Sequence, residues 1–283
     1  MNNYARLPHV RNELNANGTT SNDDDILRAI ARASEFARSL TQRIFHTETA
    51  TAYFDGNGKT RLWLGASAVE PNRGDLLTVT SIAVDDNGDG TYEYTLVEGT
   101  DYWLYPDSST IAAVRIDLIV DHQTAPQVSR WAPYRRSVKI VGKWGHSETT
   151  DAVIISGAQI TGTLSSASDL TLAVSASITR DEIAPGDTLI IESEQVEVLS
   201  VSTTTVTLQT RGLNGTTAAA HTDAAIYLRR FPADLERAVA KDAARYLWNA
   251  ASGMSGLGGD GRFREAYPAI RDAIEAYRMP RVA

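Results

Sequence analysis

Three polar residues at alternating positions, Asp85, Asn87 and Asp89, precede Gly90 and copy the first half of an EF-hand calcium loop. In that loop, alternating oxygen ligands and a glycine turn wrap the ion. The second half of the pattern fails, because Leu96 stands where calcium needs a bidentate glutamate. The segment therefore predicts a hairpin turn, and we predict no metal site in this chain.

Gly256, Gly258 and Gly261 match the G-x-G-x-x-G pattern of dinucleotide-binding loops. That pattern holds a pyrophosphate only where a strand enters the loop and a helix leaves it. Here a helical segment precedes the glycines, so they indicate a linker between two helices. No cofactor is predicted.

The residues that usually perform catalysis are sparse or isolated. The chain has no cysteine, which excludes thiolate catalysis, disulfides and Cys-ligated metals. No two of the histidines lie at helical metal-ligand spacing; they are His9, His46, His122, His146 and His221. A G-x-S-x-G nucleophile motif is absent. A carboxylate pair brought together by the fold stays open, but we predict no catalytic residues and no enzyme.

Arg28, Arg32 and Arg43 fall within a narrow stripe of a predicted helix, away from its apolar side. Such a stripe suits contact with phosphates or an acidic partner, facing either a channel or another protein. A solvated helix face, paired locally with Glu35, explains the same residues equally well. The sequence leaves both interpretations open.

A second candidate contact surface is a loop rich in residue types that favour interfaces. It contains Trp131, Pro133, Tyr134, Arg135 and Arg136. The loop is expected to be exposed and to touch a partner, although its aromatic residues could equally anchor it to a sheet.

The helix that must carry the arginines is the longest periodic segment, residues 23–45. Its apolar residues share one helical stripe: Ile26, Ile30, Ala33, Ala37, Leu40 and Ile44. Asp23, Asp24 and Asp25 place negative charge on the first turn, where the helix dipole favours it. Residues 1–22 are polar and predict a flexible N-terminal arm.

Alternating apolar and polar residues predict an antiparallel β domain after this helix. Asp55, Gly56, Asn57 and Gly58 lie between two such runs and predict a β-hairpin. A second turn is predicted at 86–90, and two more strands at 112–120 and 135–145.

Residues 152–229 differ in composition from the rest. Between 152 and 228 there is no lysine. This stretch contains two arginines and eight carboxylates, so most of the net charge of -8 lies here. Short strands and turns at Pro185-Gly186 and Asn214-Gly215 predict an inserted small β-barrel or sandwich domain that is acidic and rich in Ser and Thr.

Two helical segments close the chain. Pro232, Ala233 and Asp234 predict a helix start, and a last helix follows the glycine-rich linker. The predicted fold class is α+β, with a long N-terminal helix and C-terminal helices forming a helical bundle around the β domains. The predicted domains are 1–22, 23–151, 152–229 and 230–283.

Composition limits the function further. With 283 residues, 42% of them hydrophobic, the chain can bury a sizeable core. No stretch approaches eighteen apolar residues and the first twenty lack the layout of a secretory signal, so we expect an unexported protein without a membrane partner. The net charge of -8 argues against a protein whose main task is to grip duplex DNA.

The order of these segments resembles a known family. The segment 23–45 is followed by Asp101-Tyr102, by Gly142-x-Trp144-Gly145, and by the Pro232-x-Asp234-Leu235 helix start. In that order, over 23–150 and 230–280, the segments resemble head–tail connector proteins of long-tailed bacteriophages, also called adaptor or head-completion proteins. The acidic insert departs from the simplest members and looks like a small β module of phage structural proteins.

The resemblance implies a structural virion protein that forms a ring, usually of twelve copies, between the portal and the tail, stopper or tail-terminator protein. DNA would pass through the ring with transient, non-specific contacts. It also implies assembly in the host cytoplasm, location at the head–tail junction, and docking of the last helix on the portal. The docking residues would be Phe263, Tyr267, Ile270 and Ile274. The alternatives are a phage tail protein that binds host-surface carbohydrate and an acidic hydrolase of the cell wall.

Overall fold

The computed structural model describes residues 2–15, 22–65, 73–108, 111–120, 128–251 and 261–279, with side chains for all except 249–251 and 261–267. The chain divides into two compact units and crosses between them three times. Unit 1 holds residues 1–40 and 148–277, and unit 2 holds residues 41–147 and 278–283. Each unit has a hydrophobic core of its own.

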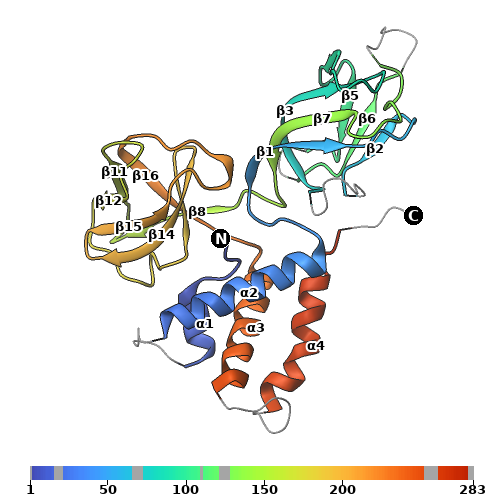
Figure 1. Ribbon diagram of the computed structural model, residues 1–283. Coiled ribbons are helices and arrows are strands. Elements are labelled where there is room, and N and C mark those ends of the chain that lie inside the picture. The colour runs from blue at the N-terminus through green and yellow to red at the C-terminus, as the bar shows by residue number, and fades with distance from the viewer. Residues whose placement is uncertain are drawn as a thin grey trace. The chain divides into compact units, whose positions relative to one another are not determined.

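Unit 1 contains the helices. They are α1 (Leu7–Glu13), α2 (Asp23–Thr41), α3 (Ala233–Ala251) and α4 (Gly261–Glu275). Both α1 and α4 pack against α3, and in Figure 1 α3 and α4 lie side by side as a helical hairpin. Tyr4, Leu7 and Val10 are buried, so the expectation of a flexible arm over residues 1–22 is wrong for this part of it. The apolar stripe of α1 is too short to stand out in the sequence.

The helix α2 begins at Asp23 as predicted but ends at Thr41 rather than at residue 45. The next residue, Gln42, has a φ of 57°, in the left-handed region that ends a helix. Ile44 extends the helical spacing by coincidence, because it is buried in the segment that enters unit 2. The predicted long helix is therefore shorter than the pattern suggested.

Unit 1 also contains a six-stranded closed β-barrel, made by the acidic segment (Figure 1). Its strands are β11 (Thr161–Leu164), β12 (Thr171–Val174), β13 (Thr188–Ile191), β14 (Glu194–Ser202), β15 (Thr205–Thr210) and β16 (His221–Arg229). The sheet closes because β16 pairs with β13 on one side and with β11 on the other. Closure removes exposed sheet edges. The short strand β8 (Thr150–Ala152) pairs antiparallel with the last residues of β16, and β9 (Ile154–Ile155) pairs with β10 (Ala158–Gln159).

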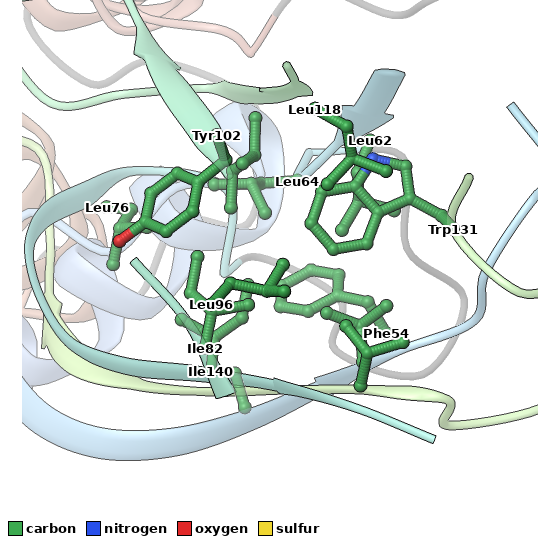
Figure 2. Close-up of a cluster of buried hydrophobic side chains, with 14 of the residues drawn as sticks. Phe54, Leu62, Leu64, Leu76, Ile82, Leu96, Tyr102, Leu118, Trp131 and Ile140 are labelled. Carbon is green, nitrogen blue, oxygen red and sulfur yellow. The ribbon is translucent and has the colours of Figure 1, made fainter. Parts of the chain in front are cut away.

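Unit 2 packs two antiparallel sheets around one core. The four-stranded sheet has the order β1 (Glu48–Phe54), β7 (Val138–Trp144), β3 (Leu76–Val84) and β4 (Tyr94–Leu96). The three-stranded sheet has the order β2 (Arg61–Trp63), β6 (Arg115–Leu118) and β5 (Tyr102–Tyr105). Figure 2 shows the core that they enclose, with Phe54, Leu62, Tyr102 and Trp131 among the buried side chains.

Gly142, in the predicted Gly-x-Trp-Gly motif, has a steric reason to be glycine. The strand β3 shifts register twice opposite β7, at Leu76/Thr78 and at Val79/Ser81. A Cβ atom at position 142 would lie 2.3 Å from the carbonyl oxygen of Thr78. The irregular strand can therefore pack against β7 only where that side chain is missing.

The hairpin predicted at residues 55–58 does not form. The strand β1 pairs with β7, while β2 pairs with β6 in the other sheet, so the turn connects two sheets. Gly56 and Gly58 instead donate backbone hydrogen bonds to Tyr134 and Trp131. The second predicted hairpin is confirmed, because β3 and β4 pair across the turn that contains residues 86–90.

The predicted fold class, an α+β protein built as a helical bundle with a long N-terminal helix, is wrong. Strands account for 35% of the chain and helices for 22%, so the protein is mostly β. Within the described residues there are four short helices, and they share unit 1 with the barrel. The prediction gave too much weight to the helices near the two ends of the chain. Their apolar residues repeat over long segments, whereas a short half-buried strand gives a weaker hydrophobic pattern.

Candidate interaction surfaces

The outer side of the three-stranded sheet in unit 2 carries six polar and aromatic side chains, which we call the aromatic face. It consists of Arg61, Trp63, Trp103, Tyr105, Arg115 and Asp117. Trp63 and Tyr105 both stand opposite Arg115, and Arg61 and Trp103 both stand opposite Asp117. The residues between them, such as Leu62 and Ile116, point into the core. Strand alternation therefore places all six on the same side.

Arg115 lies at the centre of the aromatic face. Its guanidinium carbon is 4.2 Å from the ring centroid of Tyr105 and 5.2 Å from that of Trp63. Its Nη2 donates a 2.9 Å hydrogen bond to Asp117, which fixes the guanidinium between the rings. Trp103 and Tyr105 remain 47% and 46% exposed. Trp, Tyr and Arg are the residue types that contribute most to protein interfaces, so this face is suited to binding.

The aromatic face was not among the candidate sites predicted from the sequence. The only sequence signal for this face is the alternation of residue types within the short runs 102–105 and 115–118. That alternation does not show that the two runs share one side of a sheet until the pairing of β5 with β6 is known. Strand pairing is a property of the fold, so the spacing alone carries no such information.

The structure separates the three arginines of the predicted stripe. Arg28 is exposed and pairs with Asp25, one turn away, at 3.0 Å. Arg32 pairs with the buried Asp242 of α3 at 3.1 Å, and its guanidinium lies 4.4 Å from the ring centroid of Tyr246. Arg43 lies beyond the end of α2, in unit 2. The three therefore do not form one continuous helical stripe, and their role towards a channel or partner stays a prediction.

Arg43 belongs to a buried charged cluster in unit 2. Its Nη1 is 3.3 Å from a carboxylate oxygen of Asp75 and 2.8 Å from Nδ1 of His146. Burial raises the pKa of Asp75 to about 6, although Arg43 opposes the shift. Burial and the Arg43 charge together lower the pKa of His146 to about 4. The cluster therefore connects the first residues of the 41–147 segment, through Arg43, to its last residues, through His146.

The docking residues predicted on the last helix are placed only in part. Ile270 and Ile274 are 4% and 0% exposed, so they pack inside their own unit, and of the two Ile270 lines the groove described next. The side chains of Phe263 and Tyr267 lie outside the described residues. An open groove of about 510 Å³ runs between α3 and α4. Its lining includes Asp234, Arg237, Lys241, Ala269, Ala273 and Tyr277.

The loop around Trp131 is buried at its first residue, Trp131, and exposed from Pro133 to Arg136. Trp131 is fully buried and donates from Nε1 to the carbonyl oxygen of Thr60 at 3.0 Å. Tyr134 is 43% exposed, and Pro133, Arg135 and Arg136 are exposed as well. The interpretation in which an aromatic residue holds the loop to the sheet is therefore confirmed for Trp131.

The acidic turn brings three carboxylates together. Oxygens of Asp85, Asp89 and Glu93 lie within 4.8 Å of one another, an arrangement that could accept a cation. The oxygens of Asp85 already accept hydrogen bonds from the backbone of Gly88 and Gly90, at 2.6 and 2.9 Å. Asp89 is exposed, and backbone hydrogen bonding by Thr91 lowers its pKa. The turn is thus stabilised by its own backbone, as the hairpin interpretation requires.

The barrel contains a buried ionic network around Glu194. Arg211 donates to both carboxylate oxygens at 2.7 Å, and Nε2 of His221 lies 2.8 Å from one of them. The other ring nitrogen of His221 is 2.9 Å from Glu192. Arg211 also donates to the backbone carbonyl oxygens of Ser166 and Asp169. The network joins strands β14 and β16 to their connecting loops, so its role is structural.

A catalytic arrangement is not evident in the part of the chain that the structure describes. Glu194 and Asp187 are both buried and bound by arginines, which leaves neither available as a general base. Gly256 and Gly258 lie outside the described residues, and Gly261 is the first residue of α4. None of the described helices combines the length and the apolar character needed to cross a bilayer.

Comparison of the sequence with protein-family models gives no match. Comparison with curated protein sequences gives no match either. The surfaces above therefore have to be interpreted from their own chemistry.

Proposed function

We propose that this chain is a structural virion protein that forms a ring-shaped adaptor between the portal and the tail or stopper of a long-tailed bacteriophage, and that lets DNA pass. The order of sequence motifs suggests the family, and the two-unit architecture offers separate surfaces for separate partners. We further propose that the aromatic face is a contact between neighbouring copies in the ring.

The aromatic face is the observation that carries this proposal. Two exposed aromatic rings and a fixed guanidinium on a rigid sheet make a preorganised protein contact, because little side-chain entropy is lost on binding. A ring is built from repeated head-to-tail contacts, in which one surface of each copy meets a different surface of the next, and the aromatic face can supply one of these two surfaces. A structural protein needs such contacts and needs no catalytic centre.

Electron microscopy of the purified chain, alone and mixed with the portal of the same particle, tests the proposal. We expect rings that cap the portal, and we expect the double variant Trp103→Ala/Tyr105→Ala to remain folded but to lose them. The matched control is Leu170→Ala/Leu199→Ala, which removes two exposed apolar side chains from the barrel. Rings that persist in the first variant would remove the aromatic face from the contact, and a wild-type chain that ignores the portal would overturn the adaptor function.

A carbohydrate-binding protein of the phage tail is the second candidate, and the aromatic face favours it too. Trp and Tyr rings can stack on the apolar side of a sugar, and the adjoining Arg115 and Asp117 can hydrogen-bond to its hydroxyl groups. This candidate predicts glycan binding that Trp103→Ala abolishes, together with an unchanged monomer in the presence of the portal. The same purified variants therefore separate the two functions.

A further inference from the structure

The strand β1 forms one border of the four-stranded sheet in unit 2. It pairs with β7 on one side, and no described strand pairs with it on the other (Figure 1). Its register with β7 runs without a bulge from Glu48 opposite Trp144 to Phe54 opposite Val138. The carbonyl oxygen of Ala50 accepts the indole N–H of Trp144 at 3.1 Å, and a carbonyl oxygen can accept a second hydrogen bond. The outer side of β1 can therefore pair with a further strand.

The other sheet borders among the described residues are short or closed. The barrel closes on itself, and the border strands β2, β4 and β8 have three residues each. The strand β5 has four residues and is followed by Pro106. Proteins protect sheet borders by such shortness, by closure, by proline or by lysine. By contrast, β1 has seven residues and contains neither proline nor lysine, so its border is left open to pairing.

The sequence of β1 is complementary to itself in an antiparallel pair. A two-fold axis at Thr51 overlaps all seven residues of two copies, with Thr51 opposite Thr51, Thr49 opposite Tyr53 and Ala50 opposite Ala52. Thr–Thr pairs and pairs of an aromatic with a β-branched residue stabilise antiparallel sheets. Thr49 and Thr51 are exposed, so these side chains are accessible to a second strand.

Charge also permits this pairing. Glu48 is the one charged residue of β1, and it stands at the first position. In the two-fold pair it lies opposite Phe54, so the two carboxylates do not face each other. Glu48 is also neutralised within its own copy, because Nε of Arg73 donates to it at 2.9 Å. The pair therefore brings no like charges together.

We propose that β1 binds a second copy of this chain, so that two β1 strands pair antiparallel about Thr51 and two sheets become one continuous sheet. A two-fold contact closes after two copies, so it is distinct from the head-to-tail contact of a ring and does not depend on the adaptor function. Seven residues span about 24 Å, which makes a contact smaller than the standard interface of about 800 Å² per partner. The dimer of the free chain should accordingly be weak, with a Kd of about 10 µM.

Sedimentation equilibrium of the full chain, from about 1 to about 300 µM, tests the proposal. We expect a reversible monomer–dimer equilibrium for wild type. Thr51→Lys and Thr51→Glu should each weaken the dimer by about tenfold, because each places two like charges opposite each other at the two-fold axis. An equal mixture of the two variants should dimerise at least as tightly as wild type, since opposite charges then meet.

The matched control is Thr95→Lys, which places the same charge on an exposed residue of β4, at the opposite border of the same sheet. It should leave the Kd of the dimer unchanged. A wild-type chain that stays monomeric over the whole range would overturn the proposal. Equal weakening by Thr95→Lys, or a mixture that fails to restore the dimer, would also overturn it.

A cysteine at the two-fold axis gives a direct test of the register. The chain has no cysteine, so Thr51→Cys introduces a single thiol. Opposed Cβ atoms in an antiparallel pair are about 5 Å apart, close enough for a disulfide after a small shift of the strands. We expect oxidised Thr51→Cys to form a covalent dimer on a non-reducing gel and Thr95→Cys to stay monomeric. Equal cross-linking of both variants would mean random collision and not a β1 pair.

Discussion

At the scale of single residues, the two carboxylates that contact His221, Glu192 and Glu194, should contribute very differently to the stability of the barrel. Burial acts to raise the pKa of Glu194, but hydrogen bonds from Arg211 and His221 outweigh it and lower this pKa to about 2. Because the folded-state pKa lies below the unfolded value, Glu194 stabilises the barrel above about pH 4.5 and loses that effect as the pH falls towards 2. Glu192 contacts the same imidazole but is 65% exposed.

We predict that Glu194→Gln destabilises the barrel by about 3 kcal/mol at pH 7, since it leaves the buried Arg211 without its counter-charge. Glu192→Gln should cost less than about 1 kcal/mol. Urea unfolding followed by circular dichroism at pH 7 and at pH 3 measures both effects. The difference between wild type and Glu194→Gln should shrink at pH 3, and equal effects of the two variants would contradict the structural role of the network.

At the scale of elements, Arg32 connects α2 to α3, while Arg28 touches only its own helix. We predict that Arg32→Ala lowers the stability of unit 1 by about 1–2 kcal/mol, because it removes both the ring contact with Tyr246 and one counter-charge of the buried Asp242. Arg28→Ala should change stability by less than about 0.5 kcal/mol, since both partners of its ion pair are exposed. Thermal unfolding of the two single variants gives the comparison. A greater loss in Arg28→Ala would mean that the exposed arginine, not Arg32, supports the helices.

Sequence periodicity predicted individual elements better than their connections. The helix starts at Asp23 and at Ala233 are confirmed, because caps and acidic first turns are encoded locally. The hairpin at residues 55–58 was wrong, because the choice between a hairpin and a crossing to a second sheet depends on distant strands. The aromatic face likewise depends on the pairing of β2 and β5 with β6, so this candidate site was less predictable than the strands that carry it.

At the scale of the whole molecule, the sequence order conceals which unit a residue stabilises. Met279 comes four residues after α4 ends, yet it belongs to unit 2. Its N–H donates to the carbonyl oxygen of Thr41 at 3.0 Å, and its side chain is 7% exposed. A Cβ on Gly65 or Gly74 would lie 2.2 or 2.3 Å from its Sδ, so both glycines leave room for this side chain. Ile274, five positions earlier, is fully buried in unit 1.

Two truncations at these positions should therefore destabilise different units. We predict that Met279→Ala lowers the local stability of unit 2 by about 2 kcal/mol and that Ile274→Ala lowers that of unit 1 by about 3 kcal/mol, because each removes buried apolar atoms and leaves a space behind. Hydrogen exchange followed by mass spectrometry resolves the two. Exchange should accelerate in β2 and β3 for Met279→Ala, and in α3 and α4 for Ile274→Ala. If both variants accelerated exchange in the helices alone, the last residues would belong to unit 1, and the third crossing between the units would not exist.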